Sequence, residues 1–534
     1  TTWSRGLGDV YKRQIQLQPL NLNYTPESHR EGLATYFREF LRAHMKTWIN
    51  DENNRKPDGS KYNLNTDGLK IYTTINYSMQ EMAENAVLTH MPRLQKEFFE
   101  QNETLDDSIA PFRELTSGAV DTLLRISMRR SERWRKMKYD LKKDNEEIEE
   151  SFFVPKEMTV FSWEGEIDTI MTPLDSMKYY KSFFRPGMMS MDPTNGYIKA
   201  WVGGMNYRHF QYDMVKKGKR QIGSTFKPFV YAAAIDQLKL SPCDTFPDSQ
   251  FCIEKNKFGN VEQWCPKNSG DKYGRTRTLK NALANSVNTV TARLMDRIGP
   301  RTVVKLAKDL GIEQRILPVP SIALGTPDLS VYEMVAAYST FANKGVYTQP
   351  VFIERIEDKN GTTLYENKPV TRDVLSEEAA YVTVNLLEGV TKAGSGTRLR
   401  TTGADEFNRA YQNVVTGYPY EFTNPIAGKT GTTQNQSDGW FIGMVPNLVT
   451  GVWVGAEDRA IHFEDIAYGQ GASMALPIWG VYMKSVYQDS TLMISKDSFE
   501  RPKRLSIELD CNKFVIDSIG SGKTTDQEIL DIDF

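Results

Sequence analysis

The stretch Gly223-Ser224-Thr225-Phe226-Lys227-Pro228-Phe229 places a serine three residues before a lysine at the start of an apolar segment. A helix with one buried stripe is expected from residue 224 to about residue 240, because apolar residues recur at helical spacing, at Phe226, Val230, Ala234 and Leu238. Pro228 has no amide to donate to an earlier carbonyl, so it fits only in the first turn of that helix. The serine is therefore expected at the helix N-terminus.

This placement suits a nucleophile. Ser224 would lie beside unpaired helix amides, which favour developing negative charge, and Lys227 would lie one turn on, on the same face. A free lysine, with a pKa of about 10.4, is a poor base at neutral pH. Buried among the aromatic side chains of this stretch, Lys227 can lose its proton and activate the serine.

The same four-residue pattern occurs a second time, at Ser269-Gly270-Asp271-Lys272. This copy lies in a polar, glycine-flanked stretch without apolar periodicity, which is typical of a loop. We therefore expect it to have no catalytic role.

A second candidate element is Asn285-Ser286-Val287-Asn288, at the junction of two helical patterns. Ser286 and Asn288, two residues apart, can point into one cleft, where one relays a proton and the other binds an amide. The alternative is that both are helix-capping residues, which are common at such junctions.

A third candidate element is Lys429-Thr430-Gly431-Thr432-Thr433, on a predicted strand edge. Gly431 allows close approach of another backbone, Lys429 supplies a cation, and the threonines supply hydroxyl donors.

Composition limits the class of protein. The 534 residues are too many for one ordinary domain, and 40% hydrophobic with 25% charged residues is typical of a globular chain. A net charge of −2 argues against nucleic acid as the partner. The five histidines and four cysteines show no metal-ligand spacing, so no metal and no cofactor are predicted.

The cysteines are Cys243, Cys252, Cys265 and Cys511. Cys252 and Cys265 flank a Gly-Asn turn signal and can form a disulfide in an oxidising compartment. The connectivity of the four does not follow from the sequence.

Periodicity gives a coarse outline of the N-terminal part. Residues 15–53 are compatible with a helix, residues 69–75 alternate as in a strand, and residues 79–90 predict a helix that ends before Pro92. Residues 125–150 carry a basic run and then an acidic one, which predicts a solvated, charged helix.

The later part favours an α/β fold. Residues 188–202 read as strand, turn and strand, and residues 279–298 as two short helices. Three further strands are predicted at 426–432, 440–445 and 449–454, as an antiparallel meander. This order indicates helices packed on a mostly antiparallel sheet.

The three elements in this order, Ser-x-x-Lys, Ser-x-Asn and Lys-Thr-Gly, resemble the signature set of penicillin-binding proteins and serine β-lactamases. The surrounding residues resemble class A, bifunctional penicillin-binding proteins, at 223–229, Trp264-x-Pro-x-Asn268, Asn281-Ala-Leu-x-x-Ser286-x-Asn288, Ala323-Leu-Gly325, Phe341-Ala-Asn343-x-Gly345, Gly428-Lys-Thr-Gly-Thr-Thr433 and Asp438-Gly-Trp-Phe-Ile-Gly443.

The resemblance implies the penicillin-binding/serine β-lactamase-like transpeptidase fold over residues 186–490. Residues 15–185 would be a linker and pedestal region downstream of a membrane anchor and glycosyltransferase domain that this chain lacks, and residues 491–534 a C-terminal tail or truncated domain. Residues 1–14 resemble the translation of a sequencing adapter and are excluded from fold reasoning.

The implied activity is that of a peptidoglycan DD-transpeptidase, with DD-carboxypeptidase activity as a side reaction. Ser224 would attack the penultimate D-Ala carbonyl of a stem pentapeptide, Lys227 would take the serine proton, and Ser286 would pass a proton to the leaving amine. Asn288 would bind a substrate amide. The backbone amides of Ser224 and Thr432 would form the oxyanion hole.

The third element would hold the substrate. Lys429, Thr430 and Thr432 would bind the substrate carboxylate, or that of a β-lactam, with Gly431 and Thr433 completing the site. Lys429 is counted among the catalytic residues.

The implied partners are stem peptides, glycan strands, β-lactams and cell-wall assembly proteins. The implied location is the periplasm, on the outer face of the cytoplasmic membrane, with membrane contact through the missing N-terminal part. Two rival functions remain open: a β-lactamase, which would hydrolyse the acyl-enzyme quickly, and a wall-binding scaffold or β-lactam sensor without peptide turnover.

Overall fold

A five-stranded antiparallel sheet lies at the centre of the computed structural model, which describes residues 31–400 and 414–513. The strand order is β14 (Ala427–Thr432), β15 (Asp438–Val445), β16 (Leu448–Gly455), β4 (Arg185–Met191) and β5 (Ile198–Val202). The predicted meander and the predicted strand pair are therefore confirmed, and they join edge to edge through β16 and β4. The expected α/β fold about an antiparallel sheet is confirmed.

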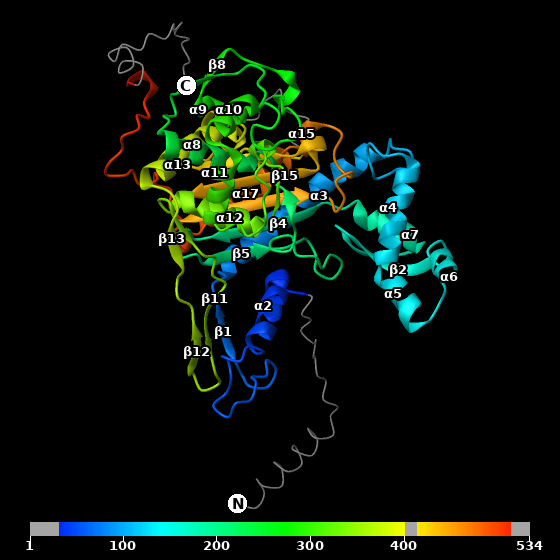
Figure 1. The fold of residues 1–534 in the computed structure, drawn as a ribbon. Coiled ribbons are helices and arrows are strands. Elements are labelled where there is room, and N and C mark those ends of the chain that lie inside the picture. Colours follow the sequence, from blue (N-terminus) through cyan, green and yellow to red (C-terminus); the bar gives the residue numbers. More distant parts are fainter. Residues whose placement is uncertain (1–30, 401–413, 514–534) are drawn as a thin grey trace, which may run out of the picture.

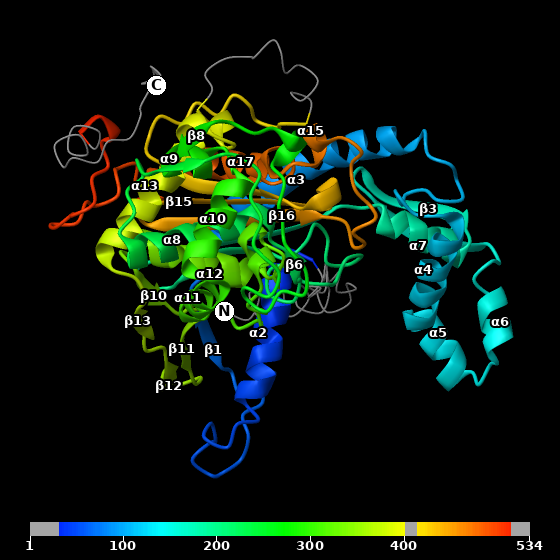
Figure 2. The ribbon, with the colours of Figure 1, turned by 45° about the horizontal axis from the view of Figure 1, so that its top comes forward.

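Helices cover both faces of this sheet because its strands alternate. On β15, Trp440 and Ile442 contribute to one hydrophobic core and Phe441 to the other. The first core includes α8 (Lys227–Leu238), α12 (Val331–Ala342) and α13 (Glu377–Ala393), and the second includes α3 (Tyr77–Asn102) and α17 (Leu476–Gln488). Figure 2 shows the strands between these two helical layers. Each fully buried side chain of this size contributes about 1.5–3 kcal/mol.

The prediction that the helix after residue 79 ends before Pro92 is wrong. Helix α3 continues through Pro92 to Asn102. Met91, Leu94 and Phe98 have no exposed surface, so this part of the helix is held by the second core. Their burial outweighs the roughly 3 kcal/mol that a proline costs inside a helix.

The region assigned to a linker and pedestal contributes directly to the body. Besides α3, helix α2 (Thr35–Trp48) stacks Phe40 on Trp201 of β5, with ring centroids 4.7 Å apart. Strand β1 (Lys70–Thr73), predicted from its alternation, pairs with β11 (Ile353–Glu357), which pairs with β12 (Thr363–Glu366). Residues 35–102 therefore pack directly against the body that follows residue 185.

Residues 117–181 form a lobe that projects from the body (Figure 1). It contains α4 (Ser117–Arg130), α5 (Glu132–Arg135), a π-helical turn (Lys136–Asp140), α6 (Asn145–Glu150), β2 (Lys156–Ser162), β3 (Gly165–Met171) and α7 (Pro173–Lys181). The single charged helix predicted over 125–150 is thus wrong. The helix is interrupted at Ser131, whose backbone is extended. Ser131 ends α4 and caps the N-terminus of α5.

The remaining elements are short and surround the body, namely β6 (Arg220–Gln221), β7 (Thr245–Pro247), β8 (Thr276–Thr278), α9 (Leu279–Ala284), α10 (Asn288–Ile298), α11 (Pro300–Asp309), β9 (Asp328–Leu329), β10 (Val346–Thr348), β13 (Thr371–Asp373), α15 (Ile466–Gly469) and α16 (Gly471–Met474). The predicted helical pair over 279–298 corresponds to α9 and α10.

Two disulfides connect the four cysteines. Cys252 pairs with Cys265, as the flanked turn suggested, and Cys243 pairs with Cys511. The second bond ties the described part of the C-terminal segment, residues 491–513, to the body, where Phe499 is also buried. A pairing across 268 residues leaves no local signal in the sequence.

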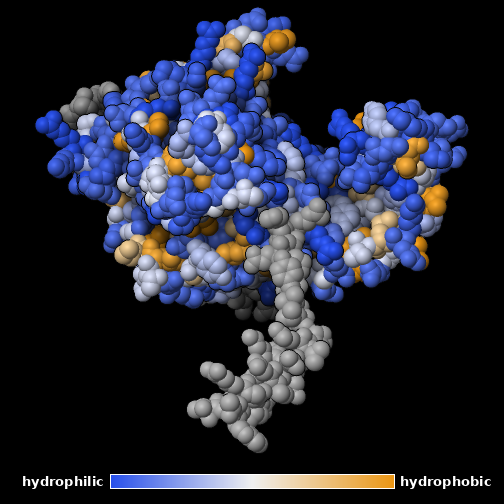
Figure 3. All heavy atoms as spheres, turned by 90° about the horizontal axis from the view of Figure 1, so that it is seen from below, coloured by the Kyte–Doolittle hydropathy of each residue, from blue (hydrophilic) through white to orange (hydrophobic). Residues whose placement is uncertain are grey.

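Seen from below, the surface is mainly hydrophilic, with hydrophobic residues in small groups on the body and the lobe (Figure 3). Across residues 31–400 and 414–513, none of the helices combines the length and the hydropathy needed to cross a membrane. The adapter-like residues 1–14, the start of the range 15–53 and the end of the segment 491–534 lie outside the described residues.

Candidate active site

Ser224 lies in a 3-10 turn, Gly223–Phe226, that leads directly into α8. The predicted helix start is therefore correct to within one turn, with Pro228 in its first positions. The turn is held against the segment around Gly325, because the Gly223 amide donates to the Gly325 carbonyl at 3.0 Å. Gly325 has a φ of +76°, and a Cβ there would lie 1.7 Å from the Gly223 oxygen, so only glycine fits.

Helix α8 is buried on every side up to Ile235, so the expected single buried stripe is wrong. Leu238, counted in that stripe, is 42% exposed. The consequence for the site is that Lys227, in the first turn of the helix, has no exposed surface.

The Lys227 ammonium nitrogen contacts three oxygens of the second element. Its Nζ lies 2.6 Å from Asn288 Oδ1 and 3.1 Å from Ser286 Oγ, and it also donates to the Ser286 carbonyl. An amide oxygen and a carbonyl accept hydrogen bonds without carrying negative charge.

Ser286 occupies the junction between α9 and α10 with a positive φ of 57°. Its Oγ lies 3.1 Å from Lys227 Nζ and 3.1 Å from Lys429 Nζ. One hydroxyl therefore joins the lysine of the first element to the lysine of the third.

Both lysines have depressed pKa values. Burial lowers the pKa of Lys227 well below its usual range, and the nearby Lys429 lowers it further. Burial lowers the pKa of Lys429 to about 7. Both effects favour the neutral form of the Lys227 amine. In the neutral form, its two N–H groups can serve the Ser286 carbonyl and Asn288 Oδ1, and its lone pair can accept from the Ser286 hydroxyl or take a proton.

Strand β14 brings the third element against the Ser224 turn. A Cβ on Gly431 would lie 2.9 Å from the Ile222 oxygen and 2.9 Å from Thr225 Cγ2, so the predicted close approach at this glycine is confirmed. Lys429 Nζ also donates to the Thr430 carbonyl at 2.9 Å.

The threonines of β14 differ in their partners. The Thr430 hydroxyl shares a hydrogen bond with Ser395, and Thr432 Oγ1 accepts from the Gly471 amide at 3.1 Å. Thr433 Oγ1 lies 3.0 Å from Ser437 Oγ and 3.2 Å from a carboxylate oxygen of Asp438. Thr433 thus stabilises the turn between β14 and β15.

A cleft of about 520 Å³ opens above these groups. Ser224, Asn288, Thr432 and Thr433 line it, whereas Lys227 and Lys429 have no exposed surface. The structure therefore brings all three predicted elements together, with the serine at the cleft and the lysines behind it. Ser269, from the second Ser-x-x-Lys copy, also lines the cleft.

Two family descriptions match the chain. "Penicillin binding protein transpeptidase domain" matches residues 187–458, and "Penicillin-binding protein middle domain" matches residues 107–184. The chain belongs to the penicillin-binding protein transpeptidase family. The resemblance stated from the three motifs is thereby confirmed.

Curated relatives agree with this assignment. Penicillin-binding protein 1A of Aquifex aeolicus is 31% identical over 449 residues, which cover 81% of this chain and 55% of that protein. Penicillin-binding protein 2D of Bacillus subtilis is 32% identical over 59% of this chain and 42% of its own length. The chain thus spans about half the length of the curated relatives it matches.

Solved structures confirm the penicillin-binding protein fold. Penicillin-binding protein 1A from Haemophilus influenzae aligns with a TM-score of 0.59 and 21% identity, over 91% of this chain and 74% of that one. PonA1 from Mycobacterium tuberculosis aligns with a TM-score of 0.57 and 20% identity, over 89% of this chain and 95% of that one.

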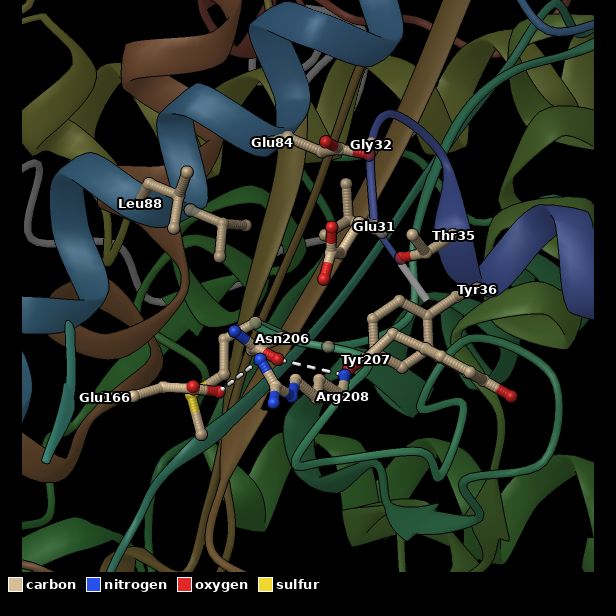
Figure 4. A pocket seen from close by; sticks show the side chains of 14 residues that line it. Glu31, Gly32, Thr35, Tyr36, Glu84, Leu88, Glu166, Asn206, Tyr207 and Arg208 are labelled. Carbon is tan, nitrogen blue, oxygen red and sulfur yellow. Dashed lines mark hydrogen bonds and ion pairs between the residues drawn. The ribbon is translucent and has the colours of Figure 1, made fainter. Parts of the chain in front are cut away.

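The chain has a second polar hollow, at the start of α2 and beside α3 (Figure 4). Its lining includes Tyr36, the half-buried Glu84 and Arg208, which pairs with Glu166 at 3.0 Å. None of the predicted site residues lies there. Among the described residues, no group of three or more metal-ligating side chains is positioned to hold a metal ion.

Ser395 and Asn268, two polar residues that contact predicted site residues, had no predicted role. Ser395, on Thr430, sits between Gly394 and Gly396 after α13, and this glycine-flanked serine is the only local signal for it. Asn268 was quoted within a motif but without a function, and it contacts the backbone of Asn288 at 3.0 Å.

Proposed function

We propose that this chain is a serine-type peptidoglycan DD-transpeptidase that cross-links stem peptides at D-Ala-D-Ala and is acylated by β-lactams. One observation carries the proposal: two fully buried lysines with lowered pKa values share one serine hydroxyl behind the cleft that Ser224 lines. Membership of the penicillin-binding protein transpeptidase family supports it.

In the acylation step, Ser224 Oγ forms a bond to the carbonyl carbon of the penultimate D-Ala, and its proton passes to the neutral amine of Lys227. The contacts of Lys227 with Asn288 and Ser286 support this role, because all three are to uncharged oxygens, which do not hold the amine in its protonated form. The oxyanion is held by the backbone amides of Ser224 and Thr432, each worth roughly 3–4 kcal/mol in comparable hydrolases.

The intermediate then breaks its C–N bond. The leaving amine takes a proton that moves from Lys227 through the Ser286 hydroxyl, and the terminal D-Ala departs. The position of Ser286 Oγ, 3.1 Å from Lys227 Nζ, supports this relay. The amine of a neighbouring stem peptide attacks the acyl-enzyme next, while water in its place would give DD-carboxypeptidation.

Substrate binding falls to the third element. Lys429, when protonated, pairs with the substrate carboxylate, and the hydroxyls of Thr430 and Thr432 donate to it. Gly431 admits the substrate backbone beside β14. Asn288 supports Lys227 and Thr433 supports the turn after β14, and both line the cleft.

The expected domain division is kept as part of this proposal, with the transpeptidase domain at 186–490. The full-length protein would also be a peptidoglycan glycosyltransferase anchored in the cytoplasmic membrane, with this part in the periplasm. Glycan strands and cell-wall assembly proteins would be its partners. The structure of PonA1 in complex with penicillin V supports β-lactams as ligands.

The test is covalent labelling with a fluorescent penicillin, comparing the protein with its Ser224→Ala and Ser269→Ala variants. We expect a long-lived label that is lost only in Ser224→Ala. Release of D-Ala from a stem pentapeptide should follow the same pattern. A label retained in Ser224→Ala would refute the assignment of the nucleophile.

The same assay separates the two rival functions. A label that is lost within seconds indicates a β-lactamase. A stable label without D-Ala release or cross-linking, in the presence of an acceptor amine, indicates a sensor or scaffold. We favour neither; Thr432 and Thr433 of the third element line the same cleft as Ser224, which supports binding of the stem peptide there.

A further inference from the structure

The side chain of Asn288 is held at both ends. Its Oδ1 accepts from Lys227 Nζ at 2.6 Å, and its Nδ2 donates to the Lys267 carbonyl at 2.7 Å. The direction of the Lys227 amine therefore depends on where Asn288, the first residue of α10, is placed.

The N-terminus of α10 is capped from outside the helix. Its own N-cap residue, Val287, has no side chain that can accept a hydrogen bond. Asn268 takes this place, because its Oδ1 accepts from the amides of Asn288 at 3.0 Å and Thr289 at 3.1 Å.

The other end of the Asn268 amide is anchored as firmly. Its Nδ2 donates to Asp248 Oδ1 at 2.7 Å and to the Lys272 carbonyl at 3.0 Å. All four hydrogen-bonding positions of this amide are filled within the protein. Asn268 thus has no donor or acceptor left for a substrate, although it lines the cleft.

Asp248 is a fully buried carboxylate that joins several segments. Besides Asn268, it accepts from Thr289 Oγ1 at 2.8 Å, from the Gly274 amide at 3.0 Å and from Arg277. Burial raises the pKa of Asp248, but these hydrogen bonds outweigh it and hold the pKa below its usual value. The carboxylate is therefore a permanent acceptor for Asn268.

We infer that Asn268, held by Asp248, is a positioning residue for the acylation step, which acts through Asn288 on the amine of Lys227. The inference rests on the proposed function. A segment of the cleft wall is thereby connected to the general base by two successive amides. The Cys252–Cys265 disulfide and the hydrogen-bonded pair Ile253 and Trp264 close the hairpin that ends just before Asn268.

The inference predicts which kinetic constant changes. Acylation by penicillin divides into a non-covalent dissociation constant and a first-order acylation rate. In Asn268→Ala we expect the acylation rate to fall about 10- to 100-fold, because Asn288, which fixes the direction of the Lys227 amine, is no longer held in place. The dissociation constant should stay within about twofold, since β14 supplies the ligand contacts.

Asn260→Ala is the matched control. Asn260 lies in the turn of the same hairpin, where its amide donates to the carbonyls of Glu254 and Glu262, and it does not line the cleft. This variant loosens the hairpin without touching α10. Its acylation rate should remain within about twofold of the unchanged protein.

A donor–acceptor exchange tests the contact itself. Asn268→Asp keeps an acceptor for the α10 amides but sets a second carboxylate against Asp248 and the Lys272 carbonyl, so its acylation rate should fall. Adding Asp248→Asn restores a donor opposite an acceptor and should recover about tenfold of that loss. This double variant keeps the test decisive if Asn268→Ala does not fold.

The outcomes separate this inference from the proposed function. If the unchanged protein is not acylated at Ser224, the proposed function fails. If it is acylated and Asn268→Ala matches Asn260→Ala, or the exchange recovers nothing, only the positioning role of Asn268 is overturned. A change in the dissociation constant alone would instead make Asn268 a ligand contact and would also overturn the inference.

Discussion

The serines of the two Ser-x-x-Lys copies line the same cleft, but the lysine of one copy is buried and the lysine of the other is exposed. Ser224 and Lys227 lie at the start of a helix buried on every side, and Lys227 has no exposed surface. Ser269 begins a short turn in which Gly270 has a φ of +66°, and the side chain of Lys272 is exposed. Both serines line the cleft. The pattern alone therefore does not decide which serine is activated.

The difference lies in what burial does to an amine. A lysine in water keeps its proton at neutral pH, whereas burial without a carboxylate partner lowers its pKa. Lys227 is surrounded by uncharged oxygens and by a second lysine, Lys429, so its neutral form is favoured. A general base is thus made by the core around the motif and not by the motif itself.

The largest expected difference in acylation rate is between variants that lack the lysine of one or the other Ser-x-x-Lys copy. Lys227→Ala should lower the rate of penicillin acylation by about 10³-fold, because a positioned general base contributes typically 10²- to 10⁴-fold. Lys272→Ala should change it less than about twofold. The measurement is the time course of fluorescent labelling. Equal losses in the two variants would contradict the distinction between the copies.

The glycines near the two serines offer the next comparison. In Gly431→Ala, the new methyl group would press on the Ile222 carbonyl and displace the Ser224 turn, which should lower acylation about 10²-fold. Gly270→Ala has open space around its new Cβ. Its positive φ makes the turn less stable, but acylation should stay within about threefold. A normal rate in Gly431→Ala would show that the turn tolerates displacement.

The sequence predicted the parts of the molecule that local patterns encode. Alternating strands identified the central sheet, and Pro228 identified the start of α8. The contacts that assemble the site are long-range and were not predicted. Two examples are the hydrogen bond between Ser395 and Thr430 and the one from Asn268 to Asp248. The same holds for Pro92, where tertiary burial keeps a helix intact against its local preference.

The pH dependence of acylation should separate the two buried lysines. The acylation rate should rise with pH as Lys227 loses its proton, about tenfold per unit on the acid side. Penicillin binding should weaken above about pH 7, where Lys429 loses its charge in the free protein. Stopped-flow labelling at several concentrations gives both constants. An alkaline loss confined to the acylation rate would contradict this assignment.

Removing Lys429 should also shift the acid side of that profile. Its charge lowers the pKa of Lys227, so Lys429→Met should raise that pKa and move the rise of the acylation rate to higher pH. Lys272→Met, an equal change at the exposed copy, should leave the profile in place. A profile unmoved by both substitutions would mean that the two buried amines do not interact.

The smallest expected effect is that of Lys429→Met on stability. This substitution should weaken penicillin binding but raise the free energy of unfolding. The pKa of Lys429 is lower in the folded protein than in the unfolded chain, so the fold disfavours its protonated form. The unfolded chain then binds more protons between about pH 7 and 10.5, and stability should rise with pH across that window. Lys429→Met should therefore raise the free energy of unfolding by about 1–3 kcal/mol at pH 7, with no gain above about pH 10.5.

Lys272→Met should change the free energy of unfolding by less than about 0.5 kcal/mol at either pH, because the Lys272 amine stays in water. Denaturant titrations at pH 7 and 10.5 measure both differences. A loss of stability in Lys429→Met at pH 7 would contradict this prediction. It would mean that the hydrogen bonds of Lys429 to Ser286 and Thr430 stabilise the fold by more than the burial of its charge destabilises it.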